Sequence, residues 1–391
     1  MGCHLSSFFM DATASQEGQI VPMTQTLDLF AEQQPNPTSS RPVLPSFPTT
    51  RYQGSKRKIV EPMAEAFSRL SFNTALDLFS GSGTVTLLLR HLGKRVDAND
   101  YLEFNRAIAE LFITATSSKL RSLKPAGELR ALLGHRDAAC GSLVEEHYDG
   151  IFFKSSENRE IDQFCHNVRQ VDPFRRLVYT YAVGQALMKK RPYNLFHRAN
   201  LEMRLKDVRR SFGNAATWEK SIEHHAIKAV QELVAFPFSE EPQQGKAFSA
   251  HTAQLDLLSS QYDLVYVDPP YLNGKELETN YANFYGFLNG LWRYDLFEKG
   301  DATYPHKPLL LPDSGWCNER SALEQVERCV KKWPSAVLFV SYRSDGLPTG
   351  PKLREVLSTG HRRTELHSFG EFKYALSRTD TNEELYVLSY P

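Results

Sequence analysis

The stretch "ALDLFSGSGTVTLLLRHL", residues 75–92, decides the fold of this chain. It begins with the short apolar run "ALDLF", continues with a turn of alternating serine and glycine, and ends with apolar residues at helical spacing. Glycine lets the backbone turn tightly and approach a ligand closely. The stretch therefore predicts a strand, a glycine turn and a helix whose N-terminal amide groups attract negative charge.

Further strands of the same sheet can be traced outward from this unit. "KRVDAND" (94–100) predicts a second strand and "EFNRAIAELFI" (103–113) a second helix, which gives two βα units of a parallel sheet. "YDLVYV" (262–267) and "SAVLFVSY" (335–342) predict two more buried strands. The tail (373–390) alternates on both sides of a polar turn and predicts an antiparallel hairpin at the sheet edge. The expected fold class is α/β.

Composition bounds what the chain can do. Its 391 residues can bury one large core or two modest ones, and between 117 and 250 the pattern changes to polar, basic, mostly helical stretches that predict a second lobe. The 46 Lys and Arg balance the 46 Asp and Glu, so binding to nucleic acid requires local basic clusters. The five cysteines never show CxxC spacing, which argues against a disulfide framework or a metal site and favours a reducing cytoplasm. No run approaches the roughly 18 to 20 apolar residues needed to cross a bilayer.

The N-terminal segment has a different composition from the rest of the chain. Residues 31–50 are rich in Pro, Ser, Thr and Gln, which predicts that 1–50 form a disordered leader and that folding starts near Arg51. Within this leader, "TLDLF" resembles the short peptides by which bacterial proteins bind the replication sliding clamp. Leu27 to Phe30 are therefore a candidate clamp contact, and a chance string in a flexible tail is the alternative.

The glycine turn and an acid after the second strand indicate a nucleotide. Gly81 and Gly83 alone are a weak signal, and a dinucleotide fingerprint would need a further glycine where this chain has Thr86. Asp100 follows about twenty residues later, where a carboxylate can bridge both hydroxyls of a ribose. The alternative interpretation is a tight βα turn in which Asp100 caps a helix.

The tetrapeptide "DPPY" follows the apolar run 262–267 directly. The Asp268 carboxylate can accept one N–H of a planar exocyclic amine such as that of adenine, and the carbonyl of Pro269 can accept the other. Proline fixes φ and so sets the carbonyl direction. Tyr271 offers a flat face on which a base outside the helix can stack. A simple strand-ending turn is the alternative, but two prolines there give up backbone donors.

These motifs and their order resemble the alpha group of DNA adenine-N6 methyltransferases, the Dam-like class that includes modification enzymes of restriction systems. "RYQGSKRKI" (51–59) precedes the glycine turn, a long insert follows it, and "DPPY" comes last, which is the order of that group. Also similar to the family are "RPYNLFHRANLEMR" (191–204), "SYRSDG" (341–346) and "YALSRTDTNEELYVL" (374–388).

The resemblance implies a Rossmann-like methyltransferase sheet that uses S-adenosylmethionine, with a catalytic domain of residues 51–116 and 251–391 and an inserted target-recognition lobe of residues 117–250. The implied catalytic residues, which hold the target adenine, are Asp268, Pro269, Pro270 and Tyr271. The implied cofactor-binding residues are Tyr52, Gly54, Lys56, Asp77, Phe79, Gly81, Gly83, Asp100 and Asp268. For the cofactor's adenine, His251 and Asp256 remain alternatives.

Two basic stretches lie in the predicted lobe. Residues 119–136 fit a solvated helix face at least as well as a DNA contact. Residues 189–210 interleave Lys and Arg with aromatic and amide side chains, a mix that can neutralise phosphates and reach base edges. The predicted contacts with double-stranded DNA are Lys189, Lys190, Arg191, Asn194, Arg198 and Arg204. The resemblance further allows a cognate restriction endonuclease as partner, and we expect a monomer with no membrane contact.

The same motifs bear on three other possible activities. A C5-cytosine methyltransferase needs a Pro-Cys nucleophile, and no cysteine here follows a proline. An RNA or other planar-amine N-methyltransferase remains an alternative, because similar turns occur wherever such an amine is methylated. A catalytically silent DNA-binding module of the same fold would be expected to lose Asp268 or the glycines.

Overall fold

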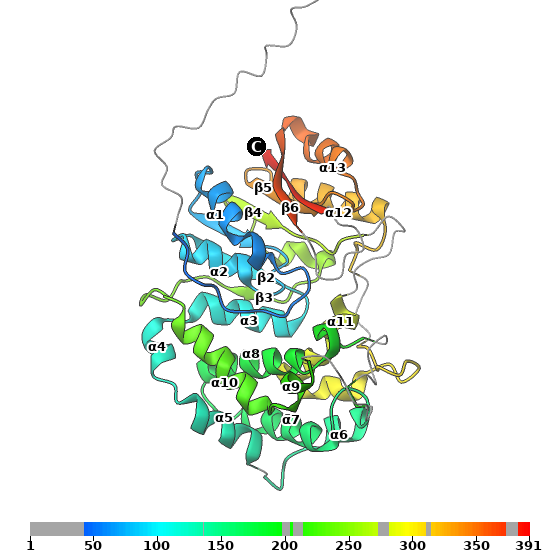
Figure 1. Ribbon diagram of the computed structural model, residues 1–391. Helices are drawn as coiled ribbons and strands as arrows, with labels where there is room; N and C mark the ends of the chain where they lie inside the picture. Colours follow the sequence, from blue (N-terminus) through cyan, green and yellow to red (C-terminus); the bar gives the residue numbers. More distant parts are fainter. Residues whose placement is uncertain are drawn as a thin grey trace, which may run out of the picture. The chain divides into compact units, whose positions relative to one another are not determined.

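A seven-stranded sheet forms the centre of the described part of the chain (Figure 1). The computed structural model describes residues 43–135, 137–197, 204–205, 214–272, 281–309, 314–372 and 382–391. The strands are β1 Thr74–Asp77, β2 Arg95–Asn99, β3 Ala247–Phe248, β4 Leu264–Val267, β5 Val337–Arg343, β6 Arg363–Phe372 and β7 Asn382–Tyr390. They lie in the order β3-β2-β1-β4-β5-β7-β6. The first five in sequence pair in parallel, whereas β7 is antiparallel to β5 and to β6.

Each central strand sends alternate side chains to two hydrophobic clusters, one on each face of the sheet. In β4, Leu264 and Tyr266 belong to one cluster, and Val265 and Val267 belong to the other. This alternation follows from the two-residue period of a strand. Because both faces are covered, the strand is apolar at every position, as is usual for parallel sheets.

Helices cover both faces of the sheet. Helices that contribute to the first cluster include α1 Val60–Ser68, α2 Thr84–His91, α3 Glu103–Thr114 and α11 Tyr281–Trp292. The helices in the second cluster are α12 Glu319–Lys332 and α13 Gly350–Leu357. Between α3 and β3 the chain forms α4 Ser117–Arg121, α5 Pro125–Gly134, α6 Leu143–Tyr148, α7 Ser155–Asn167, α8 Pro173–Lys189, α9 Asn214–Glu219 and α10 Ile222–Ala235.

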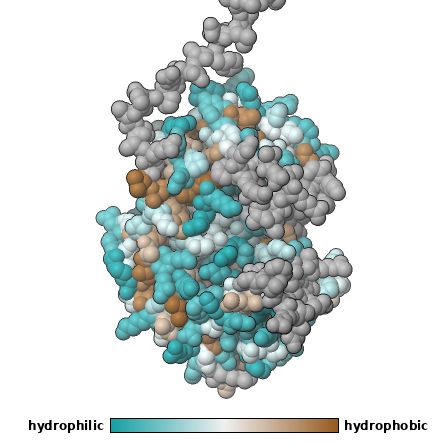
Figure 2. Space-filling view, viewed as in Figure 1, coloured by the Kyte–Doolittle hydropathy of each residue, from teal (hydrophilic) through white to brown (hydrophobic). Residues whose placement is uncertain are grey.

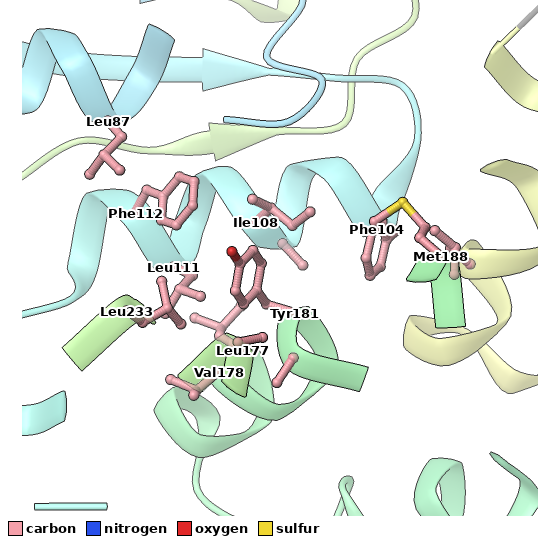
Figure 3. Packing of buried hydrophobic residues seen from close by; sticks show 14 of the residues in the cluster. Leu87, Phe104, Ile108, Leu111, Phe112, Leu177, Val178, Tyr181, Met188 and Leu233 are labelled. Atoms are coloured by element: carbon pink, nitrogen blue, oxygen red, sulfur yellow. The ribbon is translucent and has the colours of Figure 1, made fainter. Parts of the chain in front are cut away.

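The helical segment joins the sheet through the packing of α8 on α3. Figure 3 shows Phe104 near Met188, and Tyr181 facing Phe112, whose ring centroid lies 5.8 Å away in an edge-to-face arrangement. A Cβ atom at Gly184 would lie 2.2 Å from the Phe104 ring. The two helices can therefore approach this closely only because α8 has no side chain at that position.

Most of the predicted strands are confirmed. The runs that predicted strands at 94–100 and 262–267 contain β2 and β4, and those at 75–79 and 335–342 overlap β1 and β5 to within one residue. The predicted edge hairpin exists, but its first strand was placed too late in the sequence. That strand is β6, which ends at Phe372, while 373–381 lie outside the described residues.

Two other sequence predictions need correction. The predicted leader extended to residue 50, yet Phe47 is buried and its ring packs edge-to-face on Phe236, 5.1 Å away. Leu27 to Phe30 lie outside the described residues. The segment 117–250 also contains β3, which has only two residues and therefore shows no alternating pattern in the sequence.

The surface agrees with the composition of the chain. Hydrophilic residues dominate the face seen in Figure 2. Within the described ranges, none of the helices is both long and apolar enough to span a membrane. The exposed large apolar side chains come from separate parts of the sequence: Val43, Tyr193, Leu257, Tyr304 and Leu366.

We predict that Gly184→Ala destabilises the protein and that Gly127→Ala does not. The added methyl group at 184 meets the Phe104 ring, and overpacking of this kind costs about 1–3 kcal/mol. Gly127 is exposed in α5 with nothing within 4 Å, so alanine should stabilise that helix by up to about 1 kcal/mol. Urea unfolding of both variants measures the difference. Equal free energies of unfolding for Gly184→Ala and wild type would show that α8 can move away from α3 without loss of stability.

Candidate active site

A cavity of about 560 Å³ lies where the order of the parallel strands reverses. The chain runs from β1 outward through β2 to β3, then returns to β4 on the other side of β1, so the segments after β1 and β4 diverge. Such a crevice at the carboxyl ends of parallel strands is where ligands bind in open α/β sheets. Its walls are residues 52–56, the glycine turn, Asp100 and Tyr101, Asp268 and Pro270, and Tyr281.

The glycine turn has the conformation that its sequence predicts. Gly81 has φ +48° and Gly83 has φ +73°, values that favour glycine. Gly81 lines the cavity, whereas a Cβ at Gly83 would lie 2.6 Å from the Phe112 ring. Gly83 therefore sets the packing of the turn against α3, and Gly81 keeps the backbone open to a ligand.

Asp100 lies between the glycine turn and α3. Its carboxylate accepts hydrogen bonds from the amide groups of Gly81 (2.8 Å) and Leu102 (2.9 Å) and from the side chain of Asn105 (3.2 Å). These bonds tie the glycine turn to the start of α3, although the N-cap residue of that helix is Leu102 rather than Asp100. Asp100 also lines the cavity, and ribose binding by its carboxylate stays a prediction.

Asp77 is placed differently from its prediction as a cofactor contact. It is fully buried at the end of β1, and the described residues that line the cavity do not include it. The Thr86 hydroxyl donates to one carboxylate oxygen at 2.7 Å, and the other oxygen has no hydrogen-bond partner among the described residues. Burial raises the pKa of Asp77 to about 7, and burial also raises the pKa of Asp100 to about 6.

The segment 52–56 is held over the cavity by aromatic rings of α11. The Tyr52 ring stacks on Tyr285, with centroids 4.1 Å apart, and lies parallel to Tyr281 at 5.6 Å. The Tyr285 hydroxyl accepts from the amide of Gln53 at 2.6 Å. A Cβ at Gly54 would lie 2.5 Å from the Tyr281 hydroxyl, which explains a glycine at that position. Phe79, on the opposite wall, packs edge-to-face on Trp316.

Lys56 connects Asp268 to two other buried groups. Its ammonium lies 2.8 Å from Asp268 Oδ1 and 2.8 Å from Glu384 Oε1, and it also contacts the Tyr271 hydroxyl. That hydroxyl lies 2.6 Å from Asp268 Oδ1 and 2.8 Å from Glu384 Oε1. Burial alone would lower the pKa of Lys56, but the two carboxylates outweigh it and raise that pKa, so the lysine is charged. Burial raises the pKa of Asp268, and Lys56 partly offsets the effect.

The "DPPY" residues do not all face the cavity. Asp268 and Pro270 line it, whereas Pro269 is buried behind them. Tyr271 was predicted to offer a flat stacking face, but it is only 7% exposed and its hydroxyl points to Lys56 and Asp268. In this structure Tyr271 therefore holds Asp268 in place.

Sequence reasoning assigned no role to two groups of this site. Glu384 lies in the stretch that resembled the family, but a strand pattern gives no reason to connect it with Lys56. Tyr281 follows Asp268 closely in sequence without any spacing signal. For the cofactor's adenine, neither candidate lines the cavity: His251 lies beside Tyr101, with ring centroids 6.2 Å apart, and Asp256 is exposed.

Three of the predicted DNA contacts are interior residues, so that prediction was wrong for them. Lys190 is 1% exposed and pairs with Glu157 at 3.0 Å. Arg204 binds the same carboxylate. Arg191 is also 1% exposed and donates to the carbonyl of Phe152 at 3.2 Å. A buried cation bonded to protein atoms cannot neutralise a phosphate in this position.

The other predicted DNA contacts are Lys189, Asn194 and Arg198, which lie close together in the sequence. Lys189, at the end of α8, and Asn194 are half-buried. Asn194 and the neighbouring Tyr193 have positive φ, and Tyr193 is 57% exposed. Arg198 lies outside the described residues.

We predict that Asp77→Asn stabilises the ligand-free protein relative to wild type, increasingly as pH rises. A carboxyl whose folded pKa is raised to about 7 stabilises the fold at low pH, and this contribution is lost as pH rises from about 4 to 7. The amide does not titrate, so the difference in unfolding free energy should grow to a few kcal/mol and level off above pH 7. Unfolding of both proteins between pH 4 and 8 measures it, with exposed Asp256→Asn as control. A pH-independent difference would contradict the buried-charge account.

Comparison with known proteins agrees with the geometry of the site. Residues 52–308 match the family model of D12 class N6 adenine-specific DNA methyltransferases, which is more than half of the chain. A Type II methyltransferase from Haemophilus parahaemolyticus, M2.HphI, is 25% identical over 328 residues, which cover 82% of this chain and 90% of that protein. The rRNA methyltransferase aviRa from Streptomyces viridochromogenes covers 89% of this chain and 88% of its own at 15% identity, and its TM-score of 0.29 establishes no likeness of fold. The chain therefore belongs to the D12 class of N6 adenine-specific DNA methyltransferases, and its activity is the methylation of adenine in DNA.

Proposed function

We propose that this adenine methyltransferase takes the methyl group from S-adenosylmethionine and places it on N6 of an adenine that has left the helix of double-stranded DNA. One observation carries the proposal: the glycine turn after β1 and Asp268 after β4 line a single cavity. A donor held by the first and an amine held by the second would meet inside it.

The cavity suits S-adenosylmethionine in charge. Asp77, Asp100 and Asp268 place three carboxyl groups in or behind its walls, which favours a positively charged ligand. When bound, the donor supplies an activated methyl group on a cationic sulfur. The proposed contacts along the walls are Tyr52, Gly54, Phe79, Gly81 and Asp100.

Asp268 can hold and orient the amine. Every contact of its carboxylate with described residues falls on Oδ1, so Oδ2 can accept an N–H of adenine N6. We assign the second N–H to the carbonyl of Pro269. Acceptors on both N–H groups draw the nitrogen toward a tetrahedral geometry, which makes its lone pair available. The N–C bond forms as the S–C bond breaks, and the amine then loses one proton to solvent.

The target adenine must leave the base stack to reach this cavity. Enzymes that modify a base inside a duplex rotate it into a pocket and read it there by hydrogen bonds and stacking. Tyr271, which was predicted to stack on the base, is buried with its hydroxyl bonded to Asp268 and Glu384, so we assign it to holding Asp268 instead. Tyr281 lines the same cavity and borders the space that the base would occupy.

Recognition of the DNA sequence is assigned to the inserted residues 117–250. Support comes from the exposed Tyr193 and from the half-buried Lys189 and Asn194, which are close to it in the sequence. The relative from Haemophilus parahaemolyticus carries the name of a Type II methyltransferase, which supports a role in restriction and modification. On this proposal the enzyme acts as a cytoplasmic monomer, and a restriction endonuclease of the same specificity is its cellular counterpart.

We predict that Asp268→Asn lowers kcat by on the order of a hundredfold or more, because an amide accepts an N–H less strongly than a carboxylate. Transfer of label from S-adenosylmethionine to unmethylated duplex DNA, with nucleoside analysis, measures it, and the exposed Asp345→Asn is the control. Label in N6-methyladenine that the variant loses supports the proposal. Label in RNA, or retained in the variant, would contradict it.

A further inference from the structure

Four side chains from three distant parts of the chain meet at the wall of the cavity. Lys56 belongs to the short 3-10 helix Lys56–Ile59, Asp268 and Tyr271 follow β4, and Glu384 lies in β7. The ammonium and the hydroxyl lie within hydrogen-bonding distance of each other and of one oxygen from each carboxylate. Asp268 alone among them is exposed at its side chain to an appreciable degree, 16%.

Glu384 is an unusual residue for its place in the sheet. It is fully buried, on the side of β7 that otherwise carries Tyr386 and Leu388 into the hydrophobic core. A buried carboxylate is costly unless it is paired and hydrogen-bonded, and an apolar residue of similar size often serves stability as well. Glu384 Oε1 is fully engaged instead, by Lys56, by Tyr271 and by the Ser341 hydroxyl at 2.7 Å. A charge kept there at such a cost indicates a purpose other than packing.

The contacts show what Glu384 can do. It binds the same ammonium and the same hydroxyl that bind Asp268 Oδ1. An ammonium has three N–H donors, and here its partners are Asp268, Glu384 and the Tyr271 hydroxyl. Glu384 thus fixes the two groups that fix Oδ1, while Oδ2 is left to the cavity.

We propose that Glu384 is a positioning residue of the methyl transfer, which acts through Lys56 and Tyr271 to hold the Asp268 carboxylate in the orientation that accepts the adenine amine. The proposal rests on the proposed function, because it takes Asp268 as the group that binds the amine. It also assigns Lys56 to Asp268 rather than to the cofactor. The strand β7, which is the last in the sequence, would in this way affect the chemistry at the end of β4.

The pKa of Asp268 distinguishes a positioning role of Glu384 from a role in packing alone. Glu384 and Asp268 are like charges that share one lysine, so Glu384 raises the pKa of Asp268, in addition to burial. Loss of the Glu384 charge should therefore make Asp268 easier to ionise. Lys56 and Tyr271 face Asp268 at hydrogen-bonding distance, Glu384 acts on it electrostatically through the shared lysine, and Tyr266, Tyr281 and Asp77 are the other groups that face it.

The test compares Glu384→Gln with Glu383→Gln in the full-length protein. Glu383 is the neighbouring residue of β7, whose side chain points away from this face. For Glu384→Gln we expect kcat to fall about tenfold to a hundredfold, as for small misplacements in a site, with KM for DNA and donor unchanged. The acid limb of the kcat–pH profile should move to lower pH. Glu383→Gln should leave kcat and the profile as in wild type.

A reduced kcat without movement of the acid limb, or an unchanged kcat, would overturn the proposal. If Glu384→Gln does not fold, Ser341→Ala decides, because it removes one hydrogen bond to Glu384 and keeps the charge. In that variant a several-fold loss of kcat at constant KM supports the positioning role, and an unchanged kcat refutes it. The wild-type protein is measured in the same assay as a control. If it does not label N6 of adenine in DNA, the proposed function is rejected, and that result is distinct from a failure of this inference.

Discussion

The parallel pairing of β1 with β4 is the constraint on which the site depends. Ala75 to Asp77 lie opposite Leu264 to Tyr266, so both strands end at the same edge of the sheet, and the glycine turn and Asp268 leave that edge together. Because the chain leaves β1 and β4 in opposite directions across the sheet, the two following segments part and open the cavity. The glycine turn and the Asp268 carboxylate are thereby neighbours although almost two hundred residues separate them.

The site is built from charges that the fold must bury at a cost. Asp77 and Asp100 hold carboxyl groups inside the protein with raised pKa values, and Lys56 lies between two carboxylates. Removing one partner of such a set leaves an uncompensated buried charge. We therefore regard this edge of the sheet as a region where stability is given up for binding, which is common at functional sites.

Local signals in the sequence predicted the parts of the site that are local in structure. The strand, turn and helix around Gly81, and Asp268 after its strand, follow from residue type and order. Glu384 could not be assigned, because its contact with Lys56 arises only when β7 pairs with β5 and an N-terminal segment folds over the cavity. The burial of Lys190 and Arg191 could not be predicted from the sequence either. Basic residues interleaved with aromatic residues give the same sequence pattern inside a protein as on a DNA-binding surface.

The most direct test of the account is a crystal structure with sinefungin, a non-reactive analogue of the donor, and an unmethylated duplex that contains the sequence in which the enzyme methylates adenine. We expect the analogue between residues 52–56 and the glycine turn, and the target adenine outside the helix with N6 within hydrogen-bonding distance of Asp268. Such a complex would place donor and acceptor in the one cavity between β1 and β4. An adenine that stays stacked in the duplex, or an analogue bound elsewhere, would contradict the central claim.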